Sequence, residues 1–156
     1  MTPQDLGWWG VPLAILGGAI RVGTPLLWVS LGETVTEKAG RINLGLEGSL
    51  LMGAMVAYGV ALVSGNPWLG VAAAAGVGVL LGLLHGVLCS LPRVNDTALG
   101  IALMLAGSGL AFWLGKPLIQ PSAPDLPTLD LGAFTDQPAV RAALAISPLF
   151  VLGLVL

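Results

Sequence analysis

Polar side chains that could do chemistry gather in two short stretches of an otherwise apolar sequence. The first, ETVTEKAGRINLGLEG at residues 33–48, holds three acidic and two basic side chains, and the second, PRVND, occupies residues 92–96. Such groups can hydrogen-bond a polar solute, and glycine lets a backbone follow irregular or closely packed paths. We expect a polar path lined or shaped by Asn43, Glu47, Asn95 and Asp96, with structural glycines at Gly40, Gly45, Gly48 and Gly53.

Structural explanations compete with this functional one. Glu47 falls in the first turn of a helix, where the macrodipole favours a carboxylate, so it could simply stabilise the helix end. Asn95, Asp96 and Thr97 stand where another helix begins, and capping accounts for side chains of these types there.

Arg21 is a further candidate for the path because it lies inside the first apolar segment. A charge at the centre of a membrane helix costs about 2.5–3.5 kcal/mol on insertion scales. Either this side chain has a partner or a water-filled cavity, or residues 8–20 lie along the membrane interface and place it near the headgroups. The sequence leaves both readings open.

Enzymatic motifs are weak. A nucleotide hydrolase needs G-x-x-x-x-G-K-[ST], and the Gly-Lys pair at residues 115–116 is followed by Pro117. An intramembrane serine hydrolase could be drawn from Ser108 and His85, but no oxyanion donor accompanies them. His85 and Cys89 alone make a poor metal site. We expect no catalytic residue, no metal and no cofactor on this chain.

Composition identifies the elements that must position these residues. The chain is 56% hydrophobic and 9% charged, against about 25% charged in soluble domains. A net charge of −2 with six basic residues gives no cluster of positive charge that could neutralise the phosphates of a nucleic acid. Long uncharged runs between polar boundaries are typical of membrane spans, so the predicted fold is an all-α polytopic transmembrane helix bundle.

Five hydrophobic segments are predicted at residues 11–33, 44–64, 69–91, 97–115 and 142–156. The first four are long enough for a helix to cross the bilayer, which takes roughly 20 residues. The fifth ends at residue 156 without a polar flank, and we expect it to be a span cut short. Residues 1–156 are then a single, partial transmembrane domain.

Helix-ending and helix-capping residue types around the first connection support these boundaries. Lys38 suits a last helical turn and Gly40 a C-terminal cap, while Asn43 or Thr97 could cap a following helix. Glu37 and Arg41 stand four residues apart, but Gly40 between them limits the pair to a loop contact.

Small residues recur at steps of four in two predicted spans. Such faces let helix backbones approach closely in lipid, so we expect both helices to pack tightly. The two series are Gly45, Ser49, Gly53, Ala57 and Ala61, and Gly70, Ala74, Gly78, Gly82, Gly86 and Ser90.

Basic residues predict the orientation. Lys38, Arg41 and Arg93 occupy two short connections on the same side, which the positive-inside rule makes cytoplasmic. The connection at residues 116–141 then lies outside, and its five prolines favour extended backbone. It is either a spacer or a docking surface for an external partner.

Most of the chain resembles the permeases of nucleoside and simple-sugar ABC importers. The resemblance is carried by RVGTPLLWVSLGETVTEKAGRINLGLEGSLLMGAMVA and PRVNDTALGIALMLAGSGLAFWL, and most specifically by Glu37, Gly40, Asn43, Gly45, Glu47, Gly48 and the Gly53-Ala54 pair.

The resemblance implies a multi-pass cell-membrane permease subunit, and not an enzyme. Its partners would be a second permease subunit, cytoplasmic ATPase subunits that hold ATP and Mg, and an extracytoplasmic substrate-binding protein or lipoprotein. The segment that couples such permeases to their ATPase would follow the fifth span. The alternatives are a branched-chain amino-acid permease, or a truncated or accessory membrane protein without transport activity.

Overall fold

The computed structural model describes residues 10–130, 140–141 and 144–156 of the 156-residue chain. They form two compact units, which we describe separately. The three-helix unit comprises residues 32–125, and the terminal unit combines residues 10–31 with the described part of 126–156.

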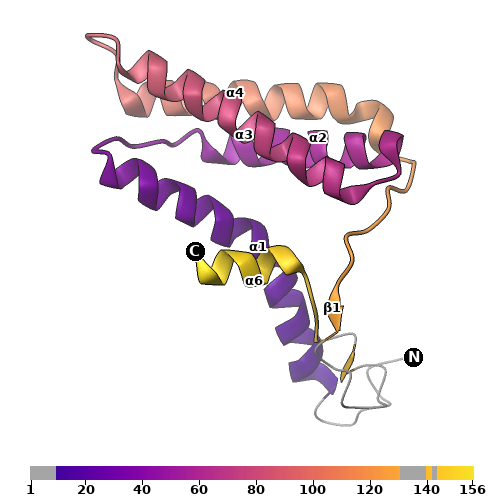
Figure 1. The fold of residues 1–156 in the computed structure, drawn as a ribbon. Coiled ribbons are helices and arrows are strands. Elements are labelled where there is room, and N and C mark those ends of the chain that lie inside the picture. The colour runs from indigo at the N-terminus through magenta and orange to yellow at the C-terminus, as the bar shows by residue number, and fades with distance from the viewer. Residues whose placement is uncertain (1–9, 131–139, 142–143) are drawn as a thin grey trace. The chain divides into compact units, whose positions relative to one another are not determined.

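The three-helix unit is built from helices α2 (Leu46–Ser64), α3 (Pro67–Cys89) and α4 (Asp96–Gly115), joined by short turns (Figure 1). Helix α2 ends at Gly65, whose φ of 67° is the left-handed conformation that glycine takes readily. Helix α3 begins at once, because Asn66 accepts the Trp68 N–H and Pro67 occupies the first helical position.

Small residues bring α2 and α3 together. A Cβ added at Gly70 would lie 3.2 Å from the Cβ of Ala61, and one at Gly53 would lie 3.8 Å from that of Ala74. The N-terminal half of the predicted small-residue face on α3 is therefore packed as expected. Its C-terminal half is open among the described residues, since a Cβ at Gly78, Gly82 or Gly86 would meet none of their atoms within 4 Å.

The terminal unit contains residues 10–31 of helix α1 (Gly10–Lys38), the strands β1 (Leu129–Asp130) and β2 (Ala145–Ile146), and helix α6 (Pro148–Val155). The two strands pair antiparallel, with Leu129 opposite Ile146. Helix α6 packs on α1 at Gly153, where an added Cβ would lie 2.8 Å from Leu27 Cδ2. Trp28 Nε1 also donates to the Leu149 carbonyl at 3.1 Å.

The predicted fifth span at residues 142–156 is helical over its last part, α6, and not over residues 145–146. Residues 145–146 form a strand, and the helix covers only eight residues from Pro148. Ser147 accepts the Leu149 N–H as the N-cap, and proline disfavours the helical conformation in the residue before it. Residues 142–143 lie outside the described part.

The proline-rich connection begins as a short 3₁₀ helix, η2 (Lys116–Leu118), and then runs without helix to β1. Tyr58 fastens its start to α2, since the Tyr58 hydroxyl donates to the Pro121 carbonyl and accepts the Ala123 N–H at 3.3 Å. The extended backbone agrees with the prediction from its prolines. Residues 131–139 of the predicted outer loop lie outside the described part.

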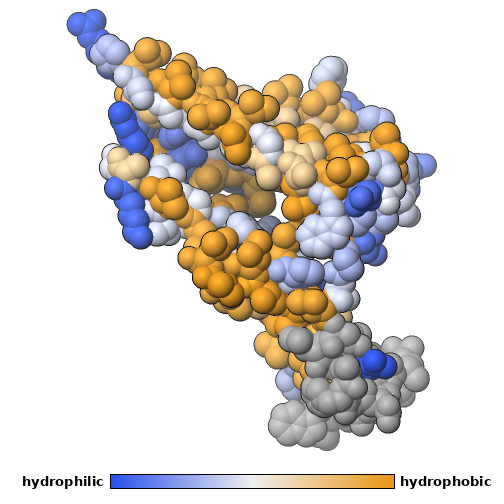
Figure 2. All heavy atoms as spheres, viewed as in Figure 1, coloured by the Kyte–Doolittle hydropathy of each residue, from blue (hydrophilic) through white to orange (hydrophobic). Residues whose placement is uncertain are grey.

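In the part of the chain that the structure describes, four helices are long and apolar enough to cross a membrane: Val11–Lys38, Leu46–Ser64, Pro67–Cys89 and Asp96–Leu118. Their large apolar side chains are mostly exposed, as Figure 2 shows by the hydrophobic colouring over the helices. The core between helices is made of small residues such as Ala61 and Ala111. Apolar surfaces of this kind are suited to lipid or to neighbouring helices, and the multi-pass helical fold is confirmed.

Candidate functional site

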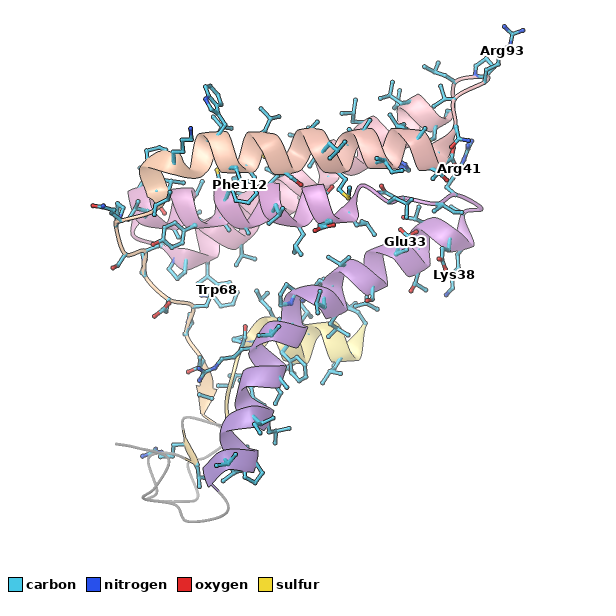
Figure 3. The ribbon with its side chains drawn as sticks, turned by 180° about the vertical axis from the view of Figure 1, so that it is seen from behind. Glu33, Lys38, Arg41, Trp68, Arg93 and Phe112 are labelled. Atoms are coloured by element: carbon cyan, nitrogen blue, oxygen red, sulfur yellow. The ribbon has the colours of Figure 1, made fainter. Side chains whose placement is uncertain are left out.

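The polar residues of the two connections meet at one end of the three-helix unit. Figure 3 shows Glu33, Lys38, Arg41 and Arg93 at this end, whereas Trp68 lies toward the other. We call residues 39–48 the glycine-rich segment.

The chain turns out of α1 through a Schellman motif. Gly40 takes a φ of 75°, its N–H donates to the Glu37 carbonyl at 2.8 Å, and the Arg41 N–H donates to the Thr36 carbonyl at 3.2 Å. A left-handed residue is needed to close this motif, which explains a glycine here. Lys38 in the last turn and the cap at Gly40 agree with the sequence prediction.

Arg41 joins the two connections. Its Nη1 lies 3.0 Å from Asp96 Oδ1 and 3.3 Å from Asp96 Oδ2. The chain leaves α1 through the Schellman motif, and Arg41 pairs with Asp96 in the first turn of α4. Since the Arg41 side chain is 45% exposed, the pair orients the loops more than it stabilises the fold.

Asn43 is buried and organises the entry to α2. Its Oδ1 accepts the Gly45 N–H at 2.9 Å, and its own N–H donates to Glu33 Oε1 at 3.2 Å. Gly45 is the N-cap of α2, and no side chain caps that helix. The predicted cap by Asn43 is therefore wrong: the side chain forms a turn before the helix, a common alternative for asparagine.

The glycine-rich segment lies directly on the backbone of α4. A Cβ at Gly100 would lie 2.7 Å from the Leu44 nitrogen, and one at Gly48 would lie 2.7 Å from Met104 Cα. A Cβ at Gly107 would lie 2.8 Å from the Gly48 carbonyl oxygen. Only glycine leaves room for these approaches. Gly53, by contrast, makes ordinary contacts with α3.

Two other predicted path residues, Glu47 and Asn95, are exposed. Glu47 lies in the first turn of α2, as expected for a carboxylate at a helix N-terminus. Asn95 caps α4 by accepting the Ala98 N–H at 3.0 Å, so the cap belongs to Asn95 and the predicted cap by Thr97 is wrong.

Arg21 lies in the terminal unit, exposed on a helix that continues without interruption from Gly10 to Lys38. Within the three-helix unit, Asn43 lies at the glycine contacts and Asp96 pairs with Arg41, whereas Glu47 and Asn95 are exposed.

Ser108 and His85 are occupied within their own helices. The Ser108 hydroxyl donates to the Met104 carbonyl at 2.7 Å, and His85 Nε2 lies 3.5 Å from Cys89 Sγ. Neither arrangement makes a nucleophile and base. Within residues 10–130, 140–141 and 144–156, no three metal-ligating side chains come together.

Three residues that matter here escaped the sequence analysis. Glu33 was not assigned a role, and Gly100 and Gly107 were not recognised as a packing face. A signal for the glycines exists, since Gly100, Gly107 and Ala111 recur at helical spacing and are all buried. For Glu33 no local pattern points to a partner ten residues away.

Comparison with known proteins identifies relatives. Residues 15–156 match the family described as "branched-chain amino acid transport system / permease component". The chain is 36% identical over 115 residues to a putative glucose ABC transporter permease, TsgC13, of Haloferax volcanii. It is 29% identical over 108 residues to the guanosine ABC transporter permease NupQ of Bacillus subtilis.

A third relative is the nucleoside ABC transporter permease NupC of Lactococcus lactis, with 29% identity over 106 residues. The alignments cover 74%, 65% and 64% of this chain, and 35%, 34% and 33% of the three relatives. The chain thus spans about a third of the length of the curated relatives it matches. No solved structure matches. Since the family match extends over nearly the whole sequence, the chain belongs to this family of multi-pass ABC transporter permeases.

Proposed function

We propose that this chain forms part of the membrane path through which an ABC importer takes up a nucleoside or a simple sugar. The single observation that carries the proposal is the glycine-rich segment, whose buried Asn43 and Gly45 lie among helices of membrane-spanning length. Irregular polar backbone at the membrane is tolerated where it is buried in protein or lines a cavity. Transporters use such interrupted elements to form solute paths.

The substrate class is supported by the relatives. The named proteins handle glucose, guanosine and nucleosides, although the family carries the name of branched-chain amino acids. Hydroxyl-rich solutes need hydrogen-bonding groups. The exposed Glu47 carboxylate is one such group, whereas the side-chain oxygens of Asn43 and Asn95 already accept backbone N–H groups. A branched-chain amino acid is the second candidate, on the strength of the family description.

Energy for transport would come from separate subunits. Residues 115–117 read Gly-Lys-Pro, which departs from the phosphate-binding loop, so ATP and Mg would be held by cytoplasmic ATPase subunits. The remaining partners would be a second permease subunit and an external binding protein or lipoprotein. Lys38, Arg41 and Arg93 at one end of the three-helix unit favour a cytoplasmic position for that end.

Uptake of labelled solutes tests the proposal. The complete permease that carries this sequence is reconstituted with its ATPase and binding protein, and uptake of a nucleoside, a hexose and leucine is compared with and without ATP. ATP-dependent uptake of the nucleoside or the hexose is expected. Uptake of leucine alone would establish the amino-acid alternative, and uptake of none of the three would contradict the proposal.

Glu47 offers a test of the path itself. Glu47→Ala is expected to lower uptake while leaving membrane insertion unchanged, because it removes an exposed carboxylate at the polar end. Val63→Ala is the matched control, since Val63 is 88% exposed on the same helix. Equal uptake by both variants would remove Glu47 from the path.

A further inference from the structure

Glu33 lies near the end of α1 and holds the backbone that follows it. Its Oε1 accepts the Asn43 N–H at 3.2 Å across ten residues of sequence. The Schellman motif at Gly40 has already turned the chain back, so this bond determines where the chain runs after the turn. Glu33 thereby ties the last turns of α1 to the glycine-rich segment.

The connection continues from Asn43 to α4. Asn43 Oδ1 accepts the Gly45 N–H, and a Cβ placed on Gly45 would already lie 3.1 Å from the Gly100 carbonyl oxygen. At such distances the two backbones have no room to move closer. A displacement of Asn43 would therefore be transmitted to the contact between the start of α2 and α4.

The second oxygen of Glu33 gives independent evidence of a role beyond packing. Oε2 is buried and has no hydrogen-bond partner within the described part of the chain. A buried oxygen without a donor destabilises a fold, and an unsatisfied group of this kind calls for an explanation. Packing alone would favour an apolar side chain at this position.

We propose that Glu33 is a positioning residue for the solute path, which acts through Asn43 to hold the glycine-rich segment against α4. The inference rests on the proposed function, because it concerns the same segment. What the role requires is an acceptor oxygen at the place of Oε1. A glutamine retains that oxygen, whereas an alanine removes it.

The experiment uses the complete importer in proteoliposomes and compares Glu33→Gln, Glu33→Ala and Val35→Ala. Val35 is the matched control because it is 68% exposed in the same turn of α1. Glu33→Ala is expected to lower the maximal uptake rate about fivefold, the effect of one lost hydrogen bond of ordinary strength. Glu33→Gln and Val35→Ala are expected to stay within about twofold of the unsubstituted protein.

Hydrogen–deuterium exchange of the peptide covering residues 39–48 gives a readout that is independent of transport. Exchange in this peptide is expected to rise in Glu33→Ala and to stay unchanged in Glu33→Gln. Asn43→Ala breaks the next link of the same chain of contacts. The double variant with Glu33→Ala should therefore transport no more slowly than the slower single variant, because the two residues act in series.

Three results would overturn the proposal: uptake and exchange in Glu33→Ala equal to those of Val35→Ala, a Glu33→Gln variant as defective as Glu33→Ala, or additive losses in the double variant. If Glu33→Ala fails to assemble, Glu33→Asp is used in its place. Unchanged exchange in this variant, whose side chain is too short to reach Asn43, would also overturn the proposal. Absence of solute uptake by the unsubstituted importer would contradict the proposed function alone. The exchange data would still decide whether Glu33 holds the segment.

Discussion

The approach of α2 to α4 predicts a sharp difference between two glycines of one helix. A Cβ at Gly107 would lie 2.8 Å from the Gly48 carbonyl oxygen and 2.9 Å from its carbonyl carbon, both of them backbone atoms that no side-chain rotation can move. A Cβ at Gly109 would meet nothing within 4 Å. Gly107→Ala should therefore destabilise the three-helix unit, and Gly109→Ala should not.

The magnitude follows from the geometry. Ordinary van der Waals contact begins at 3.4 Å, so the Gly107 methyl group would overlap Gly48 by 3.4 minus 2.8, or 0.6 Å. Because the obstacle is a helix backbone, α2 and α4 must separate and lose contacts along their length. Overpacking of this kind costs about 1–3 kcal/mol. Gly109→Ala is expected to be neutral or to stabilise the helix by up to about 1 kcal/mol.

Unfolding in mixed micelles with a rising fraction of SDS, followed by circular dichroism, measures this difference. Gly48→Ala addresses the same contact from α2, and the double variant should lose less than the sum of the two single variants because one separation relieves both clashes. A Gly107→Ala variant as stable as Gly109→Ala would refute the close approach of the two helices.

Three further predictions concern single contacts. Arg41→Ala and Asp96→Asn should each lower the free energy of unfolding by no more than about 1 kcal/mol, as for an exposed ion pair. A loss above about 2 kcal/mol in the same micelle assay would contradict an orienting role. Trp28→Phe removes the 3.1 Å bond to the Leu149 carbonyl and should lower the local stability of residues 148–155 by about 0.5–1.5 kcal/mol. Deuterium exchange should become faster in those residues and stay unchanged in residues 46–64. Tyr58→Phe removes both bonds to the start of the proline-rich connection, so limited proteolysis near residues 119–125 should become faster; an unchanged cleavage rate would show that Tyr58 does not hold it.

Helix ends could be predicted where the signal is local. The Gly40 cap and the last turn at Lys38 follow from residue types within one helical turn, and so does the cap at Asn95. Hydrophobicity alone does not locate the start of α6, which the Ser-Pro pair at residues 147–148 sets.

Contacts between distant residues could not be predicted in the same way. The small-residue series indicated that α2 and α3 pack closely, but not that Gly78 and Gly82 would stay open. The sequence predicts one group of path residues, whereas the structure joins Asn43 to Glu33 and leaves Glu47 exposed on α2. Sequence periodicity indicates which face of a helix can pack. It does not indicate which helix packs there or how far that helix is shifted along the axis.

The sequence by itself determined the membrane character, four of the spans and the family resemblance. These depend on the transfer of apolar side chains from water and on motifs contained in short stretches, which no tertiary contact alters. Only the tertiary structure decided that Arg41 pairs with Asp96 and that Gly48 meets Gly107. The two residues of the first pair are 55 positions apart in the sequence, and those of the second are 59 positions apart. Both pairs arise from the packing of whole helices, and no single stretch of sequence encodes how far one helix is shifted along another.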